Sequence, residues 1–410
     1  MSNDTQPEIR FPGFTEAWEQ RKLDDVVEFY SGLTYSPDNV QDDGTFVLRS
    51  SNVKNGEIID ADNVYISHEV VNSGNVQEGD VIVVVRNGSR DLIGKHAQIK
   101  RQMDNTVIGA FMTGVRSETP DFTNAMLDTQ QFAVEINKNL GATINQITTG
   151  AFKKMQFVVP KDRDEREAIG TFFRSIDDTI TLHQRKLDLL KETKKGFLQK
   201  MFPKNGAKVP EIRFPGFTED WEERKLKELF QPSKNKNNNG LYNQKDILAA
   251  SLGTELIPKR TFFGLKSTRE SVKNYRIVKT GDLIYTKSPI KGFPNGIIRS
   301  NKGNVGIVPP LYCVYTLQKD INSSIIQLYF EDKNRLDFYL FPLVNVGARN
   351  NVNITDLEFL EGKVTIPKSY EEQSKIVQFM EQLNTTIALH QRKLDLLKET
   401  KKGFLQKMFV

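Results

Sequence analysis

The sequence predicts an α+β protein in which two globular domains, each with a mixed sheet and short helices, are separated by two long helices that form an antiparallel coiled coil. Three observations lead to this prediction. Two segments of the chain occur twice, apolar heptads follow each of two prolines, and short strand-like apolar runs fill the segments between the repeats. The chain has 410 residues, enough for two or three domains that each bury a core.

The repeated segments indicate an internal duplication of about half the chain. PEIRFPGFTEAWEQRKL at residues 7–23 recurs at 210–226 with two positions changed, and residues 182–202 recur unchanged at 389–409. A period of about 205 residues is far too long for a solenoid. We therefore predict a pseudo-twofold internal repeat, and we call residues 7–23 and 210–226 the leading segments.

The parts between the repeated segments barely resemble each other. The leading segments and the long helices are thus duplicated, and we call them the frame. The globular parts that the frame connects are unlike. The predicted parts are a leading part at 1–23, a globular domain at 24–157, a long helix at 158–203, a linker with the second leading segment at 204–226, a second globular domain at 227–364 and a second long helix at 365–410.

The two long helices each show an apolar seam. After Pro160 and after Pro367, apolar residues recur at alternating steps of three and four, the 3.5-residue period of a coiled coil. Two near-copies in one chain are expected to pair with each other, because a lone seam would be an exposed apolar stripe. The predicted seam residues are Ile169, Phe173, Ile176, Ile180, Leu187 and Leu190 in the first helix, and Ile376, Met380, Leu383, Ile387, Leu394 and Leu397 in the second.

Polar residues mark the ends of these helices. Asp162 with Glu165, and Ser369 with Glu372, have the spacing of a capping box directly after a proline. Lysines and histidines on the seam carry a second expectation. We expect Lys194 and Lys401 to be solvated near frayed helix ends, and His183 and His390 to fix register rather than to bind a ligand.

Composition excludes several classes of protein. Cys313 is the only cysteine and the four histidines lack ligand spacing, so neither a disulfide nor a structural zinc site is expected. No apolar run is long enough to cross a membrane, and the N-terminus has no apolar stretch. We expect a soluble, cytoplasmic protein without a membrane partner.

Catalytic motifs are scarce. Residues 88–96 resemble a phosphate-binding loop, but five residues separate the glycines and His96 stands where Ser or Thr would hold magnesium. No Ser/His/Asp or Cys/His arrangement is indicated. The sequence thus favours a binding role over catalysis.

Charge is distributed unevenly over the two domains. The formal net charge is +5, yet residues 24–157 hold 11 Lys and Arg against 18 Asp and Glu, whereas residues 227–364 hold 20 against 12. Phosphate neutralisation dominates DNA affinity, so the acidic first domain is a difficulty for a DNA-binding role. We expect weak, salt-dependent DNA binding by the isolated chain.

Polar and basic loops next to short strands offer groups suited to base recognition, because Arg pairs with guanine, Asn with adenine, and Gly lets a backbone approach. For each single residue, an ordinary solvated charge remains the alternative. The candidates are Arg49, Ser51, Asn52, Arg86, Asn87, Ser89, Arg90, Lys95, His96, Lys100 and Arg101 in the first domain, and Lys234, Lys236, Lys287, Ser288, Lys291, Arg299, Arg349, Asn350 and Asn351 in the second. The run 234–239 also has the composition of a flexible loop.

These features resemble the specificity subunits of Type I restriction-modification systems, over essentially the whole chain. One departure lies in the first long helix, whose start Glu165-Arg166-Glu167-Ala168-Ile169 lacks the Glu-Gln pair of the family. The matching residues are Trp18-Glu19 and Trp221-Glu222 ahead of Lys22-Leu23 and Lys225-Leu226, the Gly79-Asp80 and Gly281-Asp282 strands, Pro160 and Pro367, and the helix start Glu371-Glu372-Gln373-Ser374-Lys375-Ile376.

The resemblance implies two target-recognition domains that each read one half of a split, asymmetric site in double-stranded DNA, with the paired helices setting the gap. It also implies two methyltransferase subunits and translocating restriction subunits as partners. S-adenosylmethionine, ATP and magnesium are then expected on those partners, with no cofactor on this chain. Two alternatives remain: a scaffold that holds two protein partners apart, and a self-contained enzyme such as a nuclease.

Overall fold

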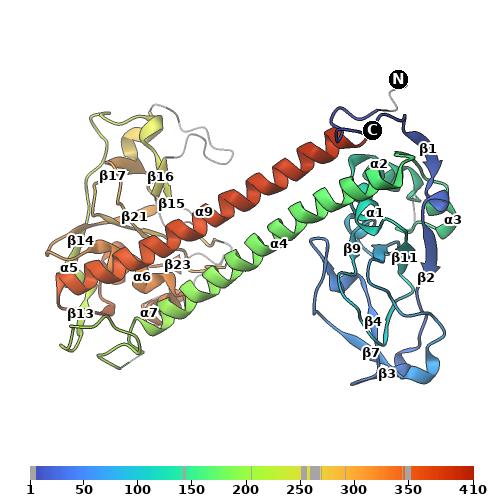
Figure 1. The fold of residues 1–410 in the computed structure, drawn as a ribbon. Coiled ribbons are helices and arrows are strands. Elements are labelled where there is room, and N and C mark those ends of the chain that lie inside the picture. The colour runs from blue at the N-terminus through green and yellow to red at the C-terminus, as the bar shows by residue number, and fades with distance from the viewer. Residues whose placement is uncertain are drawn as a thin grey trace. The chain divides into compact units, whose positions relative to one another are not determined.

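The computed structural model describes residues 6–141, 145–204, 206–250, 256–258, 268, 270–290, 292–343, 345–346 and 352–410. The chain forms two compact units (Figure 1). Unit 1 comprises Met1–Gln184 and Arg392–Val410, and unit 2 comprises Arg185–Gln391. Each unit therefore contains the start of one long helix and the end of the other.

Unit 1 contains a mixed arrangement of strands, as the sequence predicts. One four-stranded sheet is antiparallel, and a second includes a parallel pair, β10 with β4. The first sheet has the order β2 (Glu28–Ser31), β11 (Met112–Arg116), β8 (Val81–Val84), β9 (His96–Gln98); the second has the order β10 (Thr106–Ile108), β4 (Thr45–Leu48), β7 (Val64–Ile66), β3 (Val40–Gln41); β5 (Val53–Lys54) and β6 (Glu57–Ile58) form a hairpin. The short helices are α1 (Pro120–Leu127), α2 (Gln130–Asn139) and α3 (Thr149–Lys153).

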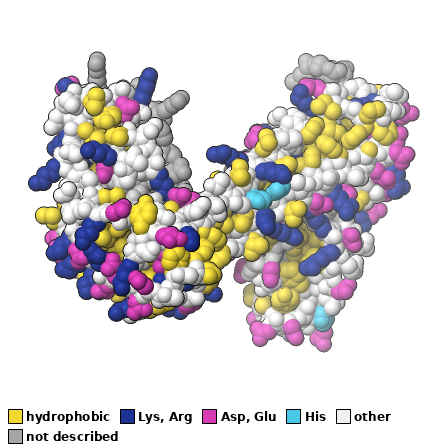
Figure 2. All heavy atoms as spheres, turned by 60° about the vertical axis from the view of Figure 1, so that its left-hand side comes forward, with side chains coloured by type: hydrophobic (Ala, Val, Ile, Leu, Met, Phe, Trp, Pro, Cys, Tyr) yellow, Lys and Arg dark blue, Asp and Glu magenta, His cyan; other side chains and the backbone are white. Residues whose placement is uncertain are grey.

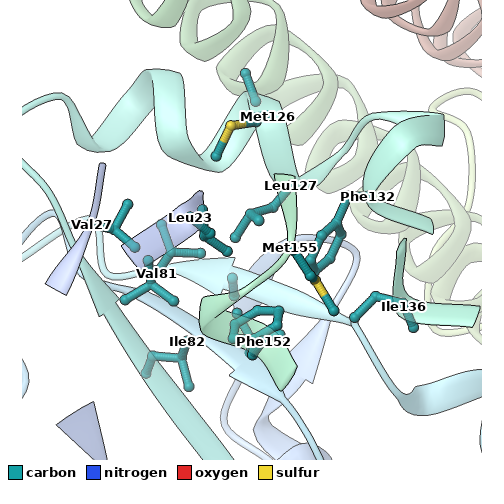
Figure 3. Packing of buried hydrophobic residues seen from close by; sticks show 14 of the residues in the cluster. Leu23, Val27, Val81, Ile82, Met126, Leu127, Phe132, Ile136, Phe152 and Met155 are labelled. Atoms are coloured by element: carbon teal, nitrogen blue, oxygen red, sulfur yellow. The ribbon is translucent and has the colours of Figure 1, made fainter. Parts of the chain in front are cut away.

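The core of unit 1 forms around β8. Each of its residues is buried, which explains why this strand is apolar throughout instead of alternating. Figure 3 shows Val81 and Ile82 beside Leu23 and Phe152, two fully buried side chains from the leading segment and from α3. The leading segment is thus part of the domain core.

Unit 2 repeats the antiparallel four-stranded sheet with unrelated residues. Its order is β14 (Phe230–Pro232), β21 (Tyr312–Leu317), β18 (Leu283–Thr286), β19 (Ile298–Ser300). Tyr285 and Tyr315 stack on Phe359 with ring centroids 4.6 and 5.2 Å apart. The other elements are the pairs β15 (Leu248–Ala250) with β16 (Leu256–Pro258), β17 (Arg276–Val278) with β20 (Gly306–Val308), and β22 (Asn345–Val346) with β23 (Val352–Asn353), and the helices α5 (Leu226–Leu229), α6 (Ser323–Glu331), α7 (Lys333–Leu340) and α8 (Asp356–Phe359).

Each leading segment adds a strand next to a long helix. β1 (Glu19–Lys22) pairs antiparallel with β12 (Gln156–Val159), and β13 (Glu222–Lys225) pairs likewise with β24 (Lys363–Ile366). In both units the second strand of the pair leads directly into a long helix. The same two-stranded element therefore positions the start of each helix.

The two long helices are α4 (Arg163–Lys200, 38 residues) and α9 (Tyr370–Met408, 39 residues). Their predicted first caps are present, since Asp162 accepts a hydrogen bond from the Asp164 amide at 2.8 Å and Ser369 accepts one from the Glu372 amide at 3.4 Å. The expected reciprocal carboxylate bonds are replaced by bonds from arginines, described below. No helix among the described residues combines the length and apolar character that a membrane crossing requires.

Within each unit the helix parts pack antiparallel. In unit 1, Phe172 contacts Phe404 and Phe173 contacts Phe409, at centroid distances of 5.0 and 5.8 Å. In unit 2 the end of α4 meets the start of α9 through Phe197 and Phe379 at 4.9 Å. Of the predicted seam residues, Ile169, Phe173, Leu187, Ile376, Met380 and Leu394 are buried, and Ile176, Ile180, Leu190, Leu383, Ile387 and Leu397 are half-buried.

Candidate nucleic-acid interface

The leading segment of unit 1 holds both long helices. Arg10 donates through Nε and Nη2 to the two carboxylate oxygens of Glu165 at 2.6 and 2.7 Å, and this carboxylate is almost fully buried. Trp18 contacts Phe409 edge-on at 6.3 Å. One short segment thus binds the start of α4 and the end of α9.

Unit 2 repeats this contact with the roles of the helices exchanged. Arg213 donates to both oxygens of Glu372 at 2.7 and 2.9 Å, and Trp221 contacts Phe202 at 5.8 Å. The Trp221 indole also donates to Glu372 at 3.1 Å. The two units therefore share these contacts between leading segment and long helices, although their globular domains are unlike.

Two lysines expected to be solvated are instead held in ion pairs, so that prediction is wrong. Lys401 lies 2.5 Å from both Asp128 and Asp177 in unit 1, and Lys194 lies 2.7 Å from Glu331 in unit 2. The acceptors lie at the ends of α1 and α6 and within α4, far from the lysines in the sequence, which a heptad pattern does not reveal. Each globular domain is thereby tied to the end of a long helix.

His96 belongs to the same cluster and is not available to DNA, which corrects its prediction as a DNA contact. Its side chain is 9% exposed and its Nε2 lies 3.3 Å from Asp128. Burial alone would lower the pKa of His96, but the hydrogen bond and charge of Asp128 raise it overall. The pKa of Asp128 is lowered although burial opposes this, because His96 and Lys401 favour the carboxylate.

Several strand ends of unit 1 meet at one open cavity of about 590 Å³. The residues after β4, after β8 and before β11 line it, and backbone bonds join them. The Gly109 amide donates to the Leu48 carbonyl at 2.8 Å, and the Val85 and Arg86 amides donate to the Phe111 carbonyl at 3.0 and 3.2 Å. Backbone hydrogen bonds thus connect the segments that line this cavity.

Four predicted residues gather at the cavity. Asn87 donates to the Ser50 hydroxyl at 2.9 Å, and Arg49 pairs with Asp62 at 2.7 Å with about a third of its side chain exposed. The guanidinium of Arg86 lies 4.9 Å from the centroid of the Phe111 ring. The predicted residues in or beside the cavity are Arg49, Ser51, Arg86 and Asn87.

The other candidates of the first domain lie elsewhere. Asn52 is fully buried and donates to the Ala61 carbonyl at 2.8 Å, so it holds its own loop and its predicted contact with DNA is corrected. Lys100 pairs with Asp178 of α4 at 2.9 Å. The remaining four, Ser89, Arg90, Lys95 and Arg101, are exposed away from this cavity.

The candidates of the second domain are more scattered. Lys287 donates to the Ile354 carbonyl and lies 3.7 Å from Asp356, while Ser288 beside it is half-buried. Arg299 is 4% exposed and its pKa is lowered by burial, so the prediction that it contacts DNA is wrong.

Two lysines of the second domain, Lys234 and Lys236, are exposed. The fully buried Asn237 donates to the Tyr242 carbonyl at 2.8 Å, so the run expected to be a flexible loop is anchored at this residue. The candidates Lys291, Arg349, Asn350 and Asn351 lie outside the described residues.

The sequence model of the Type I restriction modification DNA specificity domain matches the chain twice, at residues 15–192 and 218–399. These matches cover most of the chain. The chain belongs to this family. It is a specificity subunit, the non-catalytic component that recognises DNA sequence with two domains.

Named relatives agree with this assignment. The chain is 22% identical to the Type I restriction enzyme StySPI specificity subunit of Salmonella potsdam and 20% identical to the EcoKI specificity subunit of Escherichia coli K12. Each alignment covers 90% of this chain and 82% of the relative. The fold resembles the crystal structure of the S subunit of a Type I restriction-modification system from M. genitalium, with a TM-score of 0.65, 14% identity and 99% of each chain covered.

The surface charge of this specificity subunit is mixed. Figure 2 shows basic and acidic side chains interspersed over the visible faces of both units. Among the described residues no group of three or more His, Cys, Asp or Glu could hold a metal ion.

Sequence reasoning missed several residues of the specificity subunit that shape these sites. Phe111 is half exposed at the cavity although an apolar residue before a strand is expected in the core. A weak signal was present, because Gly109 and Ala110 before it are typical of a turn. Asp128, Asp177 and Glu331 carried no signal, since their partners lie far away in the sequence.

Proposed function

We propose that this specificity subunit recognises a bipartite, asymmetric DNA site, with one half-site read by each recognition domain and the spacer set by the helix pair. The observation that supports this most is the repeated frame. The contacts of Arg10 with Glu165 and of Arg213 with Glu372 are equivalent, while the domains between them share almost no sequence. Because two domains of different sequence are attached to the helices by equivalent contacts, we expect the two half-sites to differ in sequence.

The length of the helices gives the proposed spacer its scale. A helix of 38 residues is on the order of 55 Å long at about 1.5 Å per residue. At about 3.4 Å per base pair this corresponds to about 16 base pairs of DNA. Two readers at that separation would contact half-sites about one and a half helical turns apart.

We further propose that the chain recruits two methyltransferase subunits and the restriction subunits, in the cytoplasm where the DNA lies. The acidic balance of residues 24–157 supports a need for partners that grip the DNA backbone. In this proposal S-adenosylmethionine, ATP and magnesium bind to those partners. The S-adenosylmethionine-dependent subunits would methylate an adenine flipped from the duplex.

The decisive experiment maps methylated adenines across the genome of cells that carry this chain and its partner subunits. The expected result is one split motif that disappears when the chain is deleted. Replacing residues 24–157 by a recognition domain from another specificity subunit should then change one half of the motif and leave the other half unchanged. If both halves change, or neither does, the assignment of one half-site to each domain is wrong.

A further inference from the structure

Each recognition domain carries a large apolar side chain that points outward from the same place in its fold. Phe111 of unit 1 is 50% exposed and Leu311 of unit 2 is 57% exposed. Each residue directly precedes the strand that lies second in the four-stranded sheet, β11 or β21. Two domains without shared sequence thus keep an apolar group at an equivalent position.

The turns that carry these residues are built alike. The Met112 amide donates to the Gly109 carbonyl at 2.9 Å, and the Tyr312 amide donates to the Pro309 carbonyl at 3.0 Å. In the sheet register, Met112 pairs with the last residue of β8, and Tyr312 pairs with the last residue of β18. The equivalence therefore extends to the hydrogen bonds and the strand register.

In unit 1 the turn and its outward ring both have interaction partners. The Phe111 carbonyl accepts from the amides of Val85 and Arg86, which immobilises the turn. The Arg86 guanidinium lies over the ring at 4.9 Å, a cation–π distance. Single exposed apolar residues are common on protein surfaces. A ring that is held by an arginine at the edge of a cavity with Arg49 and Asn87 is a more specific arrangement.

The groups around Phe111 match the chemistry of the DNA major groove. Arginine and asparagine suit guanine and adenine, and the C5 methyl of thymine is the apolar group that a Phe side chain contacts there. We propose that Phe111 reads the methyl group of one thymine in the half-site of unit 1, and that Leu311 does the same in the half-site of unit 2. This inference rests on the proposed function, because it assumes that each unit reads its own half-site.

The test uses the chain assembled with its methyltransferase subunits and the site obtained from methylation mapping. Each thymine of the two half-sites is replaced singly by deoxyuridine, which removes the C5 methyl and keeps the base-pairing edge. The wild-type complex should lose about fourfold in affinity at one position of each half-site, the usual worth of one buried methyl group. F111A should remove the deoxyuridine effect in the half-site of unit 1 only, and L311A in that of unit 2 only.

Two further variants serve as controls. F111L introduces the residue that unit 2 has at this place, and it should keep a deoxyuridine effect at the same thymine. F338A removes an exposed phenyl ring on α7, where 63% of the side chain is exposed, and it should leave every deoxyuridine effect unchanged.

Several outcomes would overturn the inference. It fails if a half-site contains no thymine on either strand, or if F111A and wild type respond equally to deoxyuridine at every position. It also fails if F111A blocks assembly with the methyltransferase subunits in sedimentation experiments, because Phe111 would then belong to a protein interface. Absence of any methylation motif that depends on this chain would instead contradict the proposed function itself.

Discussion

Lys401 of α9 joins the first recognition domain through Asp128 and α4 through Asp177. It lies between Asp128 and Asp177, and 15% of its side chain is exposed. K401M keeps much of the aliphatic side chain but removes the ammonium group from Asp128 and Asp177, and leaves Asp128 with His96 as a partner. Removing one partner of a buried ion pair costs roughly 3–5 kcal/mol. Because all three side chains are partly exposed, we expect the lower end, about 3 kcal/mol, in urea unfolding of the chain.

The matched control for this prediction is Lys398, one helical turn before Lys401 and exposed. K398M should change the free energy of unfolding by no more than about 0.5 kcal/mol, as is usual for surface substitutions. Equal effects of the two substitutions would show that the ion pairs of Lys401 contribute nothing to stability.

His96 predicts a dependence of stability on pH. Its pKa is raised above 6.5 because its bond to Asp128 outweighs the effect of burial, with Lys401 opposing the shift. The folded state therefore binds this proton more tightly than the unfolded state, and the stabilisation is complete below about pH 6.5 and is lost as the pH rises through the folded-state pKa. The stability advantage of wild type over H96Q should thus shrink from pH 6 towards pH 8.

Urea unfolding of both proteins across that range measures this difference directly. The contribution of Asp177, whose pKa is raised by its own burial, is common to both proteins and cancels to a first approximation. A difference between wild type and H96Q that stays constant, or grows with pH, contradicts the assigned direction.

At the scale of elements, the two leading segments form a natural pair for comparison. Glu165 accepts hydrogen bonds from Arg10, whereas Glu372 accepts from both Arg213 and the Trp221 indole. R10M should therefore be the more destabilising substitution, because R213M leaves its carboxylate one donor. We expect a difference of about 1.5–3 kcal/mol, the range for a hydrogen bond to a charged group. The difference should vanish in urea unfolding when W18F is added to R10M and W221F to R213M, because both tryptophans are buried but only the Trp221 indole donates to the carboxylate.

The sequence predicted the elements well where local pattern decides them. The heptads after Pro160 and Pro367 predicted two long helices, and the apolar run at residues 81–85 predicted a buried strand, as found. The side-chain partners were not predictable in this way. Asn52 looked like a groove contact because its type suits adenine, yet its amide is consumed by a backbone carbonyl nine residues later.

The candidate site shows the same division between pattern and geometry. Polar loops after buried strands were recognised, and four of their residues gather at the cavity of unit 1. Arg299 has the same local signature but is buried. Burial of a charged group depends on how distant segments fold over it, in this case on α6 with Glu331, and not on its neighbours in the sequence.

At the scale of the whole molecule, the repeated frame separates two tasks. The identical segments at 182–202 and 389–409, together with the leading segments, supply the contacts that hold the helices, and they are free of the loops that line the cavity of unit 1. The loops of a recognition domain can therefore differ in sequence without altering the contacts that attach the domain to the helices. In the proposed function the helices alone set the distance between the two half-sites, and this proposal can be tested separately from sequence preference.

Lengthening both helices by one heptad provides that test. Seven residues inserted between Gln184 and Arg185 of α4, and seven between Gln391 and Arg392 of α9, keep the apolar seam in phase. The insertion adds about 10 Å, or about three base pairs, to the proposed spacer. Three base pairs also turn the second half-site about 100° around the DNA axis, so affinity should fall.

Three heptads add about nine base pairs, close to one full turn, and should restore the affinity. Methylation mapping should show half-sites of unchanged sequence, moved apart by these amounts, whereas an unchanged spacer would mean that the helices do not set the distance.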